Sequence, residues 1–231
     1  MGFPLLFLNV YPFRLIIYPS TPIHNQFVLR QQHLLNFFLH SSFGVLSIND
    51  TRLSPSNAKF IFKNEHSQHH FKSYWACSSS SRPHDGVGIL LRNPLHKHVQ
   101  TIDPWKGRLL KLDLFFHQTK ISIISIYYPP SGSIHQSICN DLIAKLLSWL
   151  DYARSNNYSV IILGDFNIDE VAHSHYSSNH FKLFRLLSSR FLPIIKPTPL
   201  QMALILLSFM IMDLPDWIIS GPHLFLPGYF G

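Results

Sequence analysis

Two polar residues that are suited to phosphate chemistry follow directly on an apolar run. Residues 160–163 are Val-Ile-Ile-Leu, which is typical of a buried strand, and Gly164 permits a tight turn at its end. Asp165 and Asn167 come next, two residues apart, so in an extended chain their side chains leave on the same face. A carboxylate and an amide there suit a hard metal ion and a phosphate. The alternative interpretation is an ordinary turn, which the same residue types also favour.

The composition indicates one sizeable folded domain with a basic surface. The chain has 231 residues, of which 46% are hydrophobic and 13% are charged, so extensive disorder is excluded. Its net charge is +7 and its pI is about 9.5. This balance favours anionic partners, with nucleic acid first, although many basic proteins bind none.

The cysteines and the apolar runs bear on the compartment. Cys77 and Cys139 are too few for a disulfide framework or a four-cysteine zinc site, which fits a reducing, intracellular compartment, nuclear or cytoplasmic. Prolines and polar residues interrupt the apolar segment 3–18, and no signal peptide is expected. The run 202–212 has about 11 residues, whereas a membrane-spanning helix needs about 20. We therefore expect no membrane partner.

Strand and helix patterns alternate after residue 40, and hairpins mix with helices without regular βαβ repetition. This order favours an α+β layered sandwich over a doubly wound sheet. Helical spacing of apolar residues predicts helices over Ile134–Asn156 and His180–Ser189. The expected strands are Phe43–Ile48, Lys72–Cys77, Gly86–Leu91, the hairpin Leu109–Phe116 with Ile121–Tyr128, and the strand that ends at Gly164.

Four short segments, taken in order, resemble a known superfamily. They are Leu46–Thr51, Gly86–Leu91, Ser125–Pro130 and Leu163–Asn167, the last containing Gly-Asp-Phe-Asn. The chain resembles the endonuclease/exonuclease/phosphatase superfamily over roughly residues 40–200, and most of all the endonuclease domains of non-LTR retrotransposons. The resemblance implies a DNase I-like four-layer α/β/β/α sandwich and hydrolysis of phosphate esters with Mg²⁺ or Mn²⁺.

The resemblance also implies metal ligands. Asp50 stands where the family places a metal-binding glutamate, and a carboxylate is a suitable ligand for Mg²⁺. Because aspartate is one methylene shorter than glutamate, the metal would have to shift or bind through water. The alternative is that Asp50 is an ordinary loop residue after a strand. Asn9 matches an asparagine at the end of the family's first strand, and Asp216 lies in a weak echo of a late family strand.

Three further residues take catalytic roles by the same resemblance. Asp165 would deprotonate the attacking water, Tyr127 would hydrogen-bond the phosphate, and Asn167 would hold the phosphate or the metal's shell. Tyr128 points to the other face of the strand and is expected to pack. Ser125 replaces the asparagine that leads the family's tyrosine motif, which weakens the local network.

The basic residues in the middle of the chain are candidates for nucleic-acid binding. DNA is the expected partner, with RNA as an alternative, and the protein is expected to be a monomer. Positive charge interleaved with tryptophan suits such contacts, but a solvated surface with ordinary core tryptophans explains the pattern equally well. The candidates are Arg82, Arg92, Lys106 and Arg108.

The sequence departs from the family at its C-terminal end. The family ends in Ser-Asp-His, whose histidine contacts the scissile phosphate, and no Asp-His pair occurs in this chain. The sandwich is therefore expected to be incomplete there, with residues 1–39 an atypical N-terminal segment containing a candidate first strand, 40–200 the catalytic-type domain and 201–231 a divergent apolar tail. A shifted reading frame would explain that tail.

Three functions remain open on the sequence alone. The first is a Mg²⁺-dependent endonuclease with reduced activity. The second is a catalytically dead remnant that binds nucleic acid, which the missing histidine favours because losing a positioned acid or base commonly lowers a rate about 10²- to 10⁴-fold. The third is a phosphatase or phosphodiesterase of the same superfamily.

Overall fold

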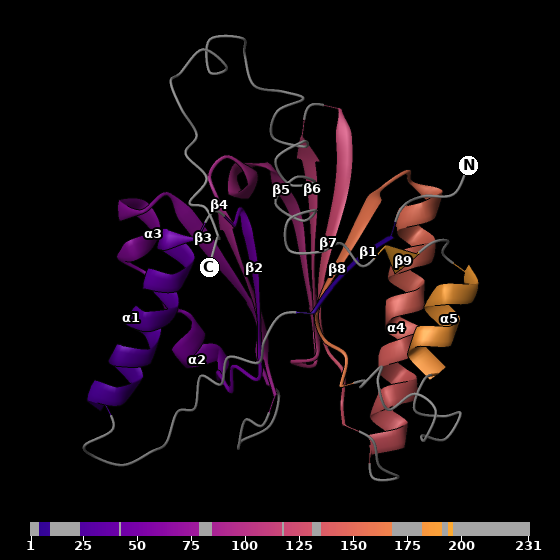
Figure 1. Ribbon diagram of the computed structural model, residues 1–231, viewed down its shortest axis with the longest axis horizontal. Helices are drawn as coiled ribbons and strands as arrows, with labels where there is room; N and C mark the ends of the chain where they lie inside the picture. The colour runs from indigo at the N-terminus through magenta and orange to yellow at the C-terminus, as the bar shows by residue number, and fades with distance from the viewer. Residues whose placement is uncertain are drawn as a thin grey trace, which may run out of the picture. The chain divides into compact units, whose positions relative to one another are not determined.

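Two β-sheets lie face to face between two layers of helices (Figure 1). The structure is a computed structural model, and every described element belongs to the unit Met1–Pro197. The described residues are 5–9, 24–41, 43–78, 85–116, 118–130, 135–167, 182–190 and 194–195.

The larger sheet has six strands in the order β5-β6-β7-β8-β1-β9. Neighbours from β5 to β7 are antiparallel, whereas β8 is parallel to both β7 and β1, and β1 is parallel to β9. The carboxyl ends of β7, β8 and β1 therefore meet at one edge of the sheet. The strands are β1 (Leu5–Asn9), β5 (Val99–Trp105), β6 (Leu109–Phe116), β7 (Thr119–Tyr127), β8 (Ser159–Asp165) and β9 (Ile194–Ile195).

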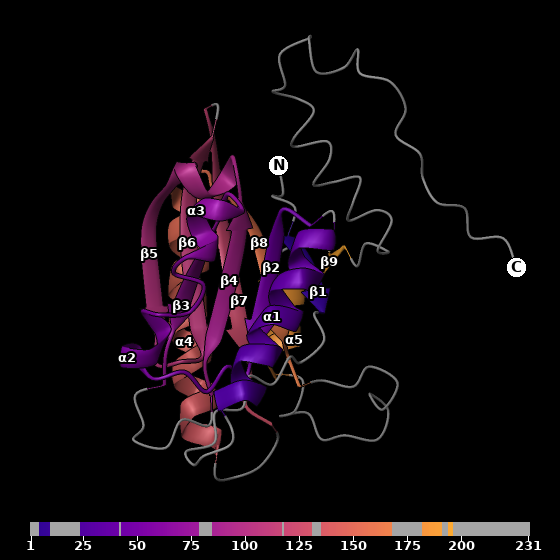
Figure 2. The ribbon, with the colours of Figure 1, turned by 90° about the vertical axis from the view of Figure 1, so that its left-hand side faces the viewer.

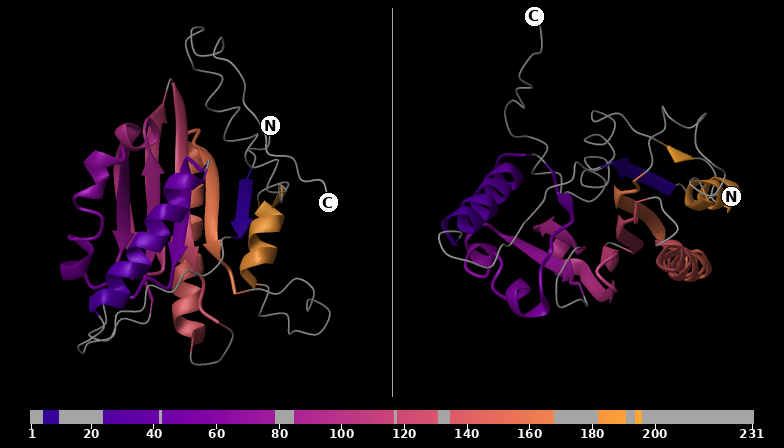
Figure 3. Two further views of the ribbon diagram at one scale, coloured as in Figure 1. Left: turned by 60° about the vertical axis from the view of Figure 1, so that its left-hand side comes forward. Right: turned by 90° about the horizontal axis from the view of Figure 1, so that it is seen from below.

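The smaller sheet has three antiparallel strands in the order β2-β4-β3, with bounds Val45–Asn49, Val87–Arg92 and Phe71–Ala76. Figure 2 shows α1 lying across its outer face, and Figure 3 shows α4 and α5 on the opposite side of the sandwich. The helices are α1 (His24–His40), α2 (Pro55–Ala58), α3 (Glu65–Gln68), η1 (Leu95–His98), α4 (Gln136–Ser155) and α5 (Lys182–Arg190).

Three separate hydrophobic cores hold these layers together. The middle core joins the sheets, with Ile89 and Leu91 of β4 packed against Leu110, Leu112 and Ile123 of the larger sheet. One outer core packs α1 on the smaller sheet, and the other packs α4 and α5 on the larger one. Burial of apolar faces on both sides of each sheet is what fixes the four-layer order. The predicted four-layer α+β sandwich is thus confirmed.

The predicted hairpin, the long helix and the strand ending at Gly164 are all present within a few residues of their expected bounds. Several elements have no counterpart in the sequence analysis, among them β5 and α1. β5 is mostly exposed, contains Pro104 and lies at the sheet edge, where proline is tolerated, so it lacks a buried-strand pattern. In residues 31–40, where its burial is described, α1 buries Leu34, Leu35 and Phe38.

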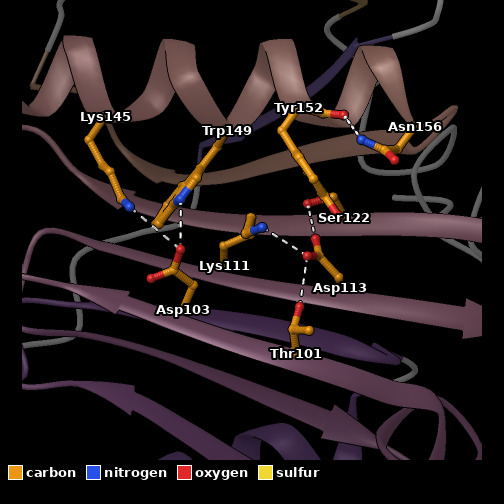
Figure 4. Close-up of polar contacts among 9 residues, drawn as sticks. All are labelled: Thr101, Asp103, Lys111, Asp113, Ser122, Lys145, Trp149, Tyr152 and Asn156. Atoms are coloured by element: carbon orange, nitrogen blue, oxygen red, sulfur yellow. Dashed lines mark hydrogen bonds and ion pairs between the residues drawn. The ribbon is translucent and has the colours of Figure 1, made fainter.

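A charged cluster is enclosed between the larger sheet and α4 (Figure 4). The Asp113 carboxylate accepts hydrogen bonds from Lys111 Nζ at 2.8 Å, Ser122 Oγ at 2.8 Å and Thr101 Oγ1 at 2.7 Å. Lys111 Nζ also lies 5.6 Å from the centre of the Trp149 ring. The cluster is therefore satisfied internally, as a buried ion pair must be.

Among the described residues, no helix combines the length and apolar character that a membrane crossing needs.

Candidate active site

Tyr127 and Asp165 end two neighbouring parallel strands and stand side by side. Their Cα atoms are partners in the register of β7 and β8. The next residue, Tyr128, donates its backbone N–H to the Asp165 carbonyl oxygen at 2.8 Å. The sheet thus extends one residue past Tyr127 and fixes the two side chains at the same edge.

Gly164 allows β7 and β8 to approach closely just before Asp165. Its φ is +134°, and a Cβ placed on it would lie 2.0 Å from the carbonyl oxygen of Ile126. No side chain fits there without moving the backbone of β7. The glycine of the Gly-Asp-Phe-Asn motif is therefore required by the strand packing that places Asp165.

Asp165 and Asn167 form a turn closed by the carboxylate. The Asn167 backbone N–H donates to Asp165 Oδ1 at 2.8 Å, and Asn167 adopts a φ of +48°. The Asn167 amide Nδ2 donates to the Tyr128 carbonyl oxygen. Residues 165–167 therefore form a turn, as the alternative interpretation of the sequence expected. The same turn holds the side chains of Asp165 and Asn167 next to the end of β7. The catalytic roles of Asp165 and Asn167 stay predictions.

Asp50 follows β2 and binds the guanidinium of Arg52 with both carboxylate oxygens. Arg52 Nε lies 3.1 Å from Asp50 Oδ1, and Arg52 Nη2 lies 3.2 Å from Asp50 Oδ2. The side chain of Asp50 is only 4% exposed, whereas that of Arg52 is 28% exposed. The predicted metal ligand is therefore a buried carboxylate whose charge a neighbouring side chain already balances.

The loop that carries this pair is held against the residues before β4. Thr51 N donates to the Gly86 carbonyl at 3.1 Å, and Arg52 N donates to the Asp85 carbonyl at 2.8 Å. A Cβ on Gly86, whose φ is +123°, would lie 2.2 Å from Thr51 Oγ1. These contacts hold Asp50 and Arg52 at positive φ angles of 54° and 52°, a conformation that structures retain where the surroundings enforce it.

A second ion pair, Asp85 with Arg108, lies behind Tyr127. Arg108 Nε is 3.3 Å from Asp85 Oδ2, both side chains are buried, and the N–H is not aligned for a hydrogen bond. The Arg108 guanidinium carbon lies 4.8 Å from the centre of the Tyr127 ring, which is a cation–π distance. Arg108 therefore supports the ring from one side.

The Tyr127 phenol is influenced by burial and by four charged side chains of this region. Burial raises the pKa of Tyr127, and the negative charges of Asp50 and Asp165 raise it further. The positive charges of Arg108 and Arg52 act in the opposite direction and do not cancel the rise. The phenol therefore stays protonated at neutral pH and is a hydrogen-bond donor in an otherwise charged site.

Asn49 contributes an unpaired amide to the same region. The residue is 1% exposed, and neither Oδ1 nor Nδ2 has a hydrogen-bond partner within the described part of the chain. Two residues earlier on β2, Ser47 bonds Ser125 of β7 through their hydroxyl oxygens at 2.7 Å. Because side chains two residues apart on a strand share a face, Asn49 also faces the larger sheet.

The donor chemistry of this region fits a divalent cation. Asp50 supplies a carboxylate and Asn49 a buried amide oxygen, both of which are ligand types for Mg²⁺ and Mn²⁺. In the described residues no group of three or more His, Cys, Asp and Glu side chains comes together. The Asn9 backbone pairs with Gly164, which places it at the same sheet edge. The Asn9 side chain and all of Asp216 lie outside the described residues.

The predicted nucleic-acid-binding residues lie in different environments, and Arg82 falls outside the described residues. Arg92 donates to the carbonyl oxygens of Phe38 and Ser41 and thereby holds the end of α1. Arg108 is buried behind Tyr127. Lys106 is exposed, lies over the Trp105 ring at 5.0 Å and is the candidate with direct access to solvent.

Sequence reasoning missed three residues of this site. Arg52 stands two residues after Asp50, a spacing that carries no specific signal, and Asp85 stands in a polar stretch that looks like an ordinary loop. Asn49 reads as the end of a strand. Their roles become visible only where β2, β4 and β7 come together.

The comparisons with known proteins found relatives among solved structures only. No protein-family model matches the sequence, and no curated protein matches it. The 3′-phosphatase NExo from Neisseria, bound to a product DNA hairpin, matches with a TM-score of 0.53 at 14% identity, over 70% of this chain and 66% of that chain. The 3′-5′ exonuclease NExo from Neisseria meningitidis matches with the same score and coverage at 18% identity.

A third structure is similar over a longer part of this chain. The AP endonuclease LMAP from Leishmania major matches with a TM-score of 0.50 at 15% identity, over 80% of this chain and 65% of that chain. The chain thus spans slightly less than two thirds of the length of these proteins. At such identities the likeness concerns the fold, and the fold of this chain is that of the DNase I-like nucleases and phosphatases.

Proposed function

We propose that this protein hydrolyses phosphodiester bonds in nucleic acid in the manner of an endonuclease, with DNA as the first substrate and RNA as the alternative. The observation that carries the proposal is that Tyr127 and Asp165 stand side by side at the ends of β7 and β8, where the Asn167 turn fixes the carboxylate. The Arg108 guanidinium lies 4.8 Å from the Tyr127 ring and adds positive charge beside the phenol. The DNase I-like fold of the described residues supports the assignment.

In this proposal Asp165 is the general base and Tyr127 stabilises the phosphate. One oxygen of Asp165 holds the turn by accepting from Asn167 N, which fixes the orientation of the carboxylate that takes a proton from water. Tyr127, which is protonated at neutral pH, donates to a phosphate oxygen as negative charge develops. The Asn167 amide uses one N–H for Tyr128 and has a second for the phosphate.

Asp50 and Asn49 would hold a Mg²⁺ or Mn²⁺ ion, with Asn9 and Asp216 as further candidate ligands. The ion would supply positive charge to the phosphate oxygens and to the leaving group. The residues of the chain bind and orient the substrate and remove the proton.

The test is the nicking of supercoiled plasmid by the purified protein, in Mg²⁺ and in EDTA. We expect slow nicking that requires Mg²⁺ and falls at least about 10²-fold in Asp165→Ala, because a positioned base contributes about 10²- to 10⁴-fold. Asp151→Ala, which removes an exposed carboxylate on α4, is the matched control and should nick normally. Equal nicking by Asp165→Ala and the wild-type protein would contradict the proposal.

A catalytically inactive protein that binds nucleic acid is the second candidate. Two observations favour it. The Arg52 guanidinium donates hydrogen bonds to both carboxylate oxygens of Asp50, the candidate metal ligand, and the sequence contains no Asp-His pair. Binding of labelled DNA without nicking, by protein that circular dichroism shows to be folded, would select this candidate. An oligonucleotide ending in a 3′-phosphate tests the phosphatase alternative in the same assay.

We further propose a retroelement origin with a shifted reading frame at the C-terminal end. The proposed catalytic-type domain over residues 40–200 also takes in β1 and α1, which lie before residue 41 and pack into the sandwich. Translation of the DNA downstream in all three frames should then show a Ser-Asp-His segment. Its absence from every frame would remove the support for this origin.

A further inference from the structure

The two-pronged contact between Arg52 and Asp50 has a consequence for the cation site. A planar guanidinium matches the two oxygens of a carboxylate and leaves little room for another cation on them. A divalent ion needs at least one of the same oxygens. The two cations therefore compete for Asp50.

Burial makes some cation at Asp50 necessary. The carboxylate side chain is only 4% exposed, and an isolated buried charge is strongly unfavourable. Arg52, at 28% exposure, keeps part of its side chain in contact with solvent. A partly exposed arginine is already partly hydrated. It can therefore leave the carboxylate for water or for an anion more easily than a fully buried arginine can.

We propose that Arg52 is an exchangeable counter-ion: it neutralises Asp50 in the absence of metal, and a divalent cation displaces it so that it binds the substrate phosphate. This inference rests on the proposed function and adds a role for a residue outside the predicted site. It makes metal binding and phosphate binding cooperative, because each favours the state in which Arg52 has left Asp50.

The backbone of the loop is held by contacts that do not involve the Arg52 side chain. The bonds of Arg52 N to the Asp85 carbonyl and of Thr51 N to the Gly86 carbonyl hold the loop whether or not the side chain is paired. Arg52 N bonds the Asp85 carbonyl, Asp85 pairs with Arg108, and the Arg108 guanidinium carbon lies 4.8 Å from the centre of the Tyr127 ring, so Arg52 and Tyr127 belong to one network of contacts. The released side chain and Tyr127 would thus bind the same anion.

The first experiment measures the affinity of the metal-free protein for Mg²⁺ by calorimetry, without any substrate. We expect Arg52→Gln to bind Mg²⁺ at least about fivefold more tightly than the wild-type protein, because the competing cation is gone and the buried carboxylate needs a partner. Arg52→Lys keeps the charge without the planar fork and should lie between the two. Asp50→Asn should bind at least about tenfold more weakly than Arg52→Gln, because it lacks the carboxylate.

Arg154→Gln is the matched control, because Arg154 is also an arginine and is exposed near the end of α4. It lies before the start of β8, whereas the site lies at the end of β8. It removes the same charge and should leave Mg²⁺ affinity unchanged. Unchanged or weaker Mg²⁺ binding by Arg52→Gln, or no binding by any variant, would overturn the inference. Thermal melts by circular dichroism check that each variant is folded. Because no cleavage is measured, an inactive protein that shows the expected shifts would contradict the hydrolase proposal alone.

The second experiment measures binding of a fluorescein-labelled, eight-nucleotide single-stranded DNA in EDTA. In the wild-type protein the Arg52 guanidinium is paired with the Asp50 carboxylate, whereas in Asp50→Asn this ion pair is lost without any metal. The loss of affinity caused by Arg52→Gln should therefore be at least about threefold larger in the Asp50→Asn background than in the wild-type background. An equal loss in both backgrounds would show that Arg52 acts only through its overall charge.

Discussion

At the scale of single residues, Tyr127 is the group on which the proposed chemistry depends. Its hydroxyl is neutral at neutral pH, burial and the charges of Asp50 and Asp165 raise its pKa further, and Arg108 supports its ring. A neutral phenol can donate a hydrogen bond to a phosphate oxygen. Because its ionisation is disfavoured, Tyr127 remains such a donor well above neutral pH.

Replacing Tyr127 by phenylalanine should lower the nicking rate about 10²-fold, the usual effect of losing one donor to a developing negative charge. Because the pKa is raised, the difference should persist from neutral pH to about pH 10, the ordinary tyrosine pKa. Tyr158→Phe, near the opposite end of β8, is the control and should nick normally. A Tyr127→Phe protein as active as the wild type would remove Tyr127 from the mechanism.

At the scale of secondary-structure elements, the charged cluster beneath α4 joins the helix to the larger sheet. Asp113 of β6 gathers donors from β5, β6 and β7, and the Lys111 ammonium lies under the rings of Trp149 and Tyr152 (Figure 4). The cluster is far more polar than the cores around it. A buried cluster of this kind is stable only while all its members are present.

Asp113→Ala should therefore lower the free energy of unfolding by about 3 to 5 kcal/mol, because it leaves the Lys111 ammonium buried without a counter-charge. The double variant Lys111→Met with Asp113→Val replaces the ion pair with apolar groups. It should be clearly more stable than Asp113→Ala alone in urea unfolding. If the double variant is the less stable of the two, the interaction of Lys111 with the aromatic rings stabilises the protein more than its pairing with Asp113 does.

At the scale of the whole domain, the site depends on how the two sheets are joined. Asp50 comes from the smaller sheet, whereas Tyr127 and Asp165 come from the larger one. Hydrophobic packing holds the sheets together without fixing their alignment, because it is not directional. The hydroxyl contact of Ser47 with Ser125, two residues before Asn49 and Tyr127 respectively, is a directional link close to the site.

Single replacement of Ser47 or Ser125 by alanine should lower the free energy of unfolding by about 1 to 2 kcal/mol, since each leaves the other hydroxyl buried without a partner. The double alanine variant should lose less than the sum of the two single losses, with a coupling of about 1 kcal/mol in urea unfolding. Additive losses would mean that the hydroxyls act independently and that packing alone aligns the sheets.

Local patterns in the sequence were sufficient for several elements. The apolar run before Gly164, the hairpin of β6 and β7, and the helical spacing in α4 each express burial within one element. The order of these elements was enough to predict an α+β sandwich, because a sheet or helix with one apolar face must bury it against another layer. Asp165, Asn167 and Tyr127 were singled out from the same local segments.

Other features depend on residues far apart in the chain, so only the tertiary structure decided them. The Asp85–Arg108 pair behind Tyr127, the link between Ser47 and Ser125, and the unpaired amide of Asn49 all arise where separate strands meet. Arg52 is near Asp50 in sequence, but its competition for the carboxylate follows from the positive φ angles that the contacts with Asp85 and Gly86 enforce. Sequence periodicity records which face of an element is buried, whereas a site is made by the side chains that different elements bring together.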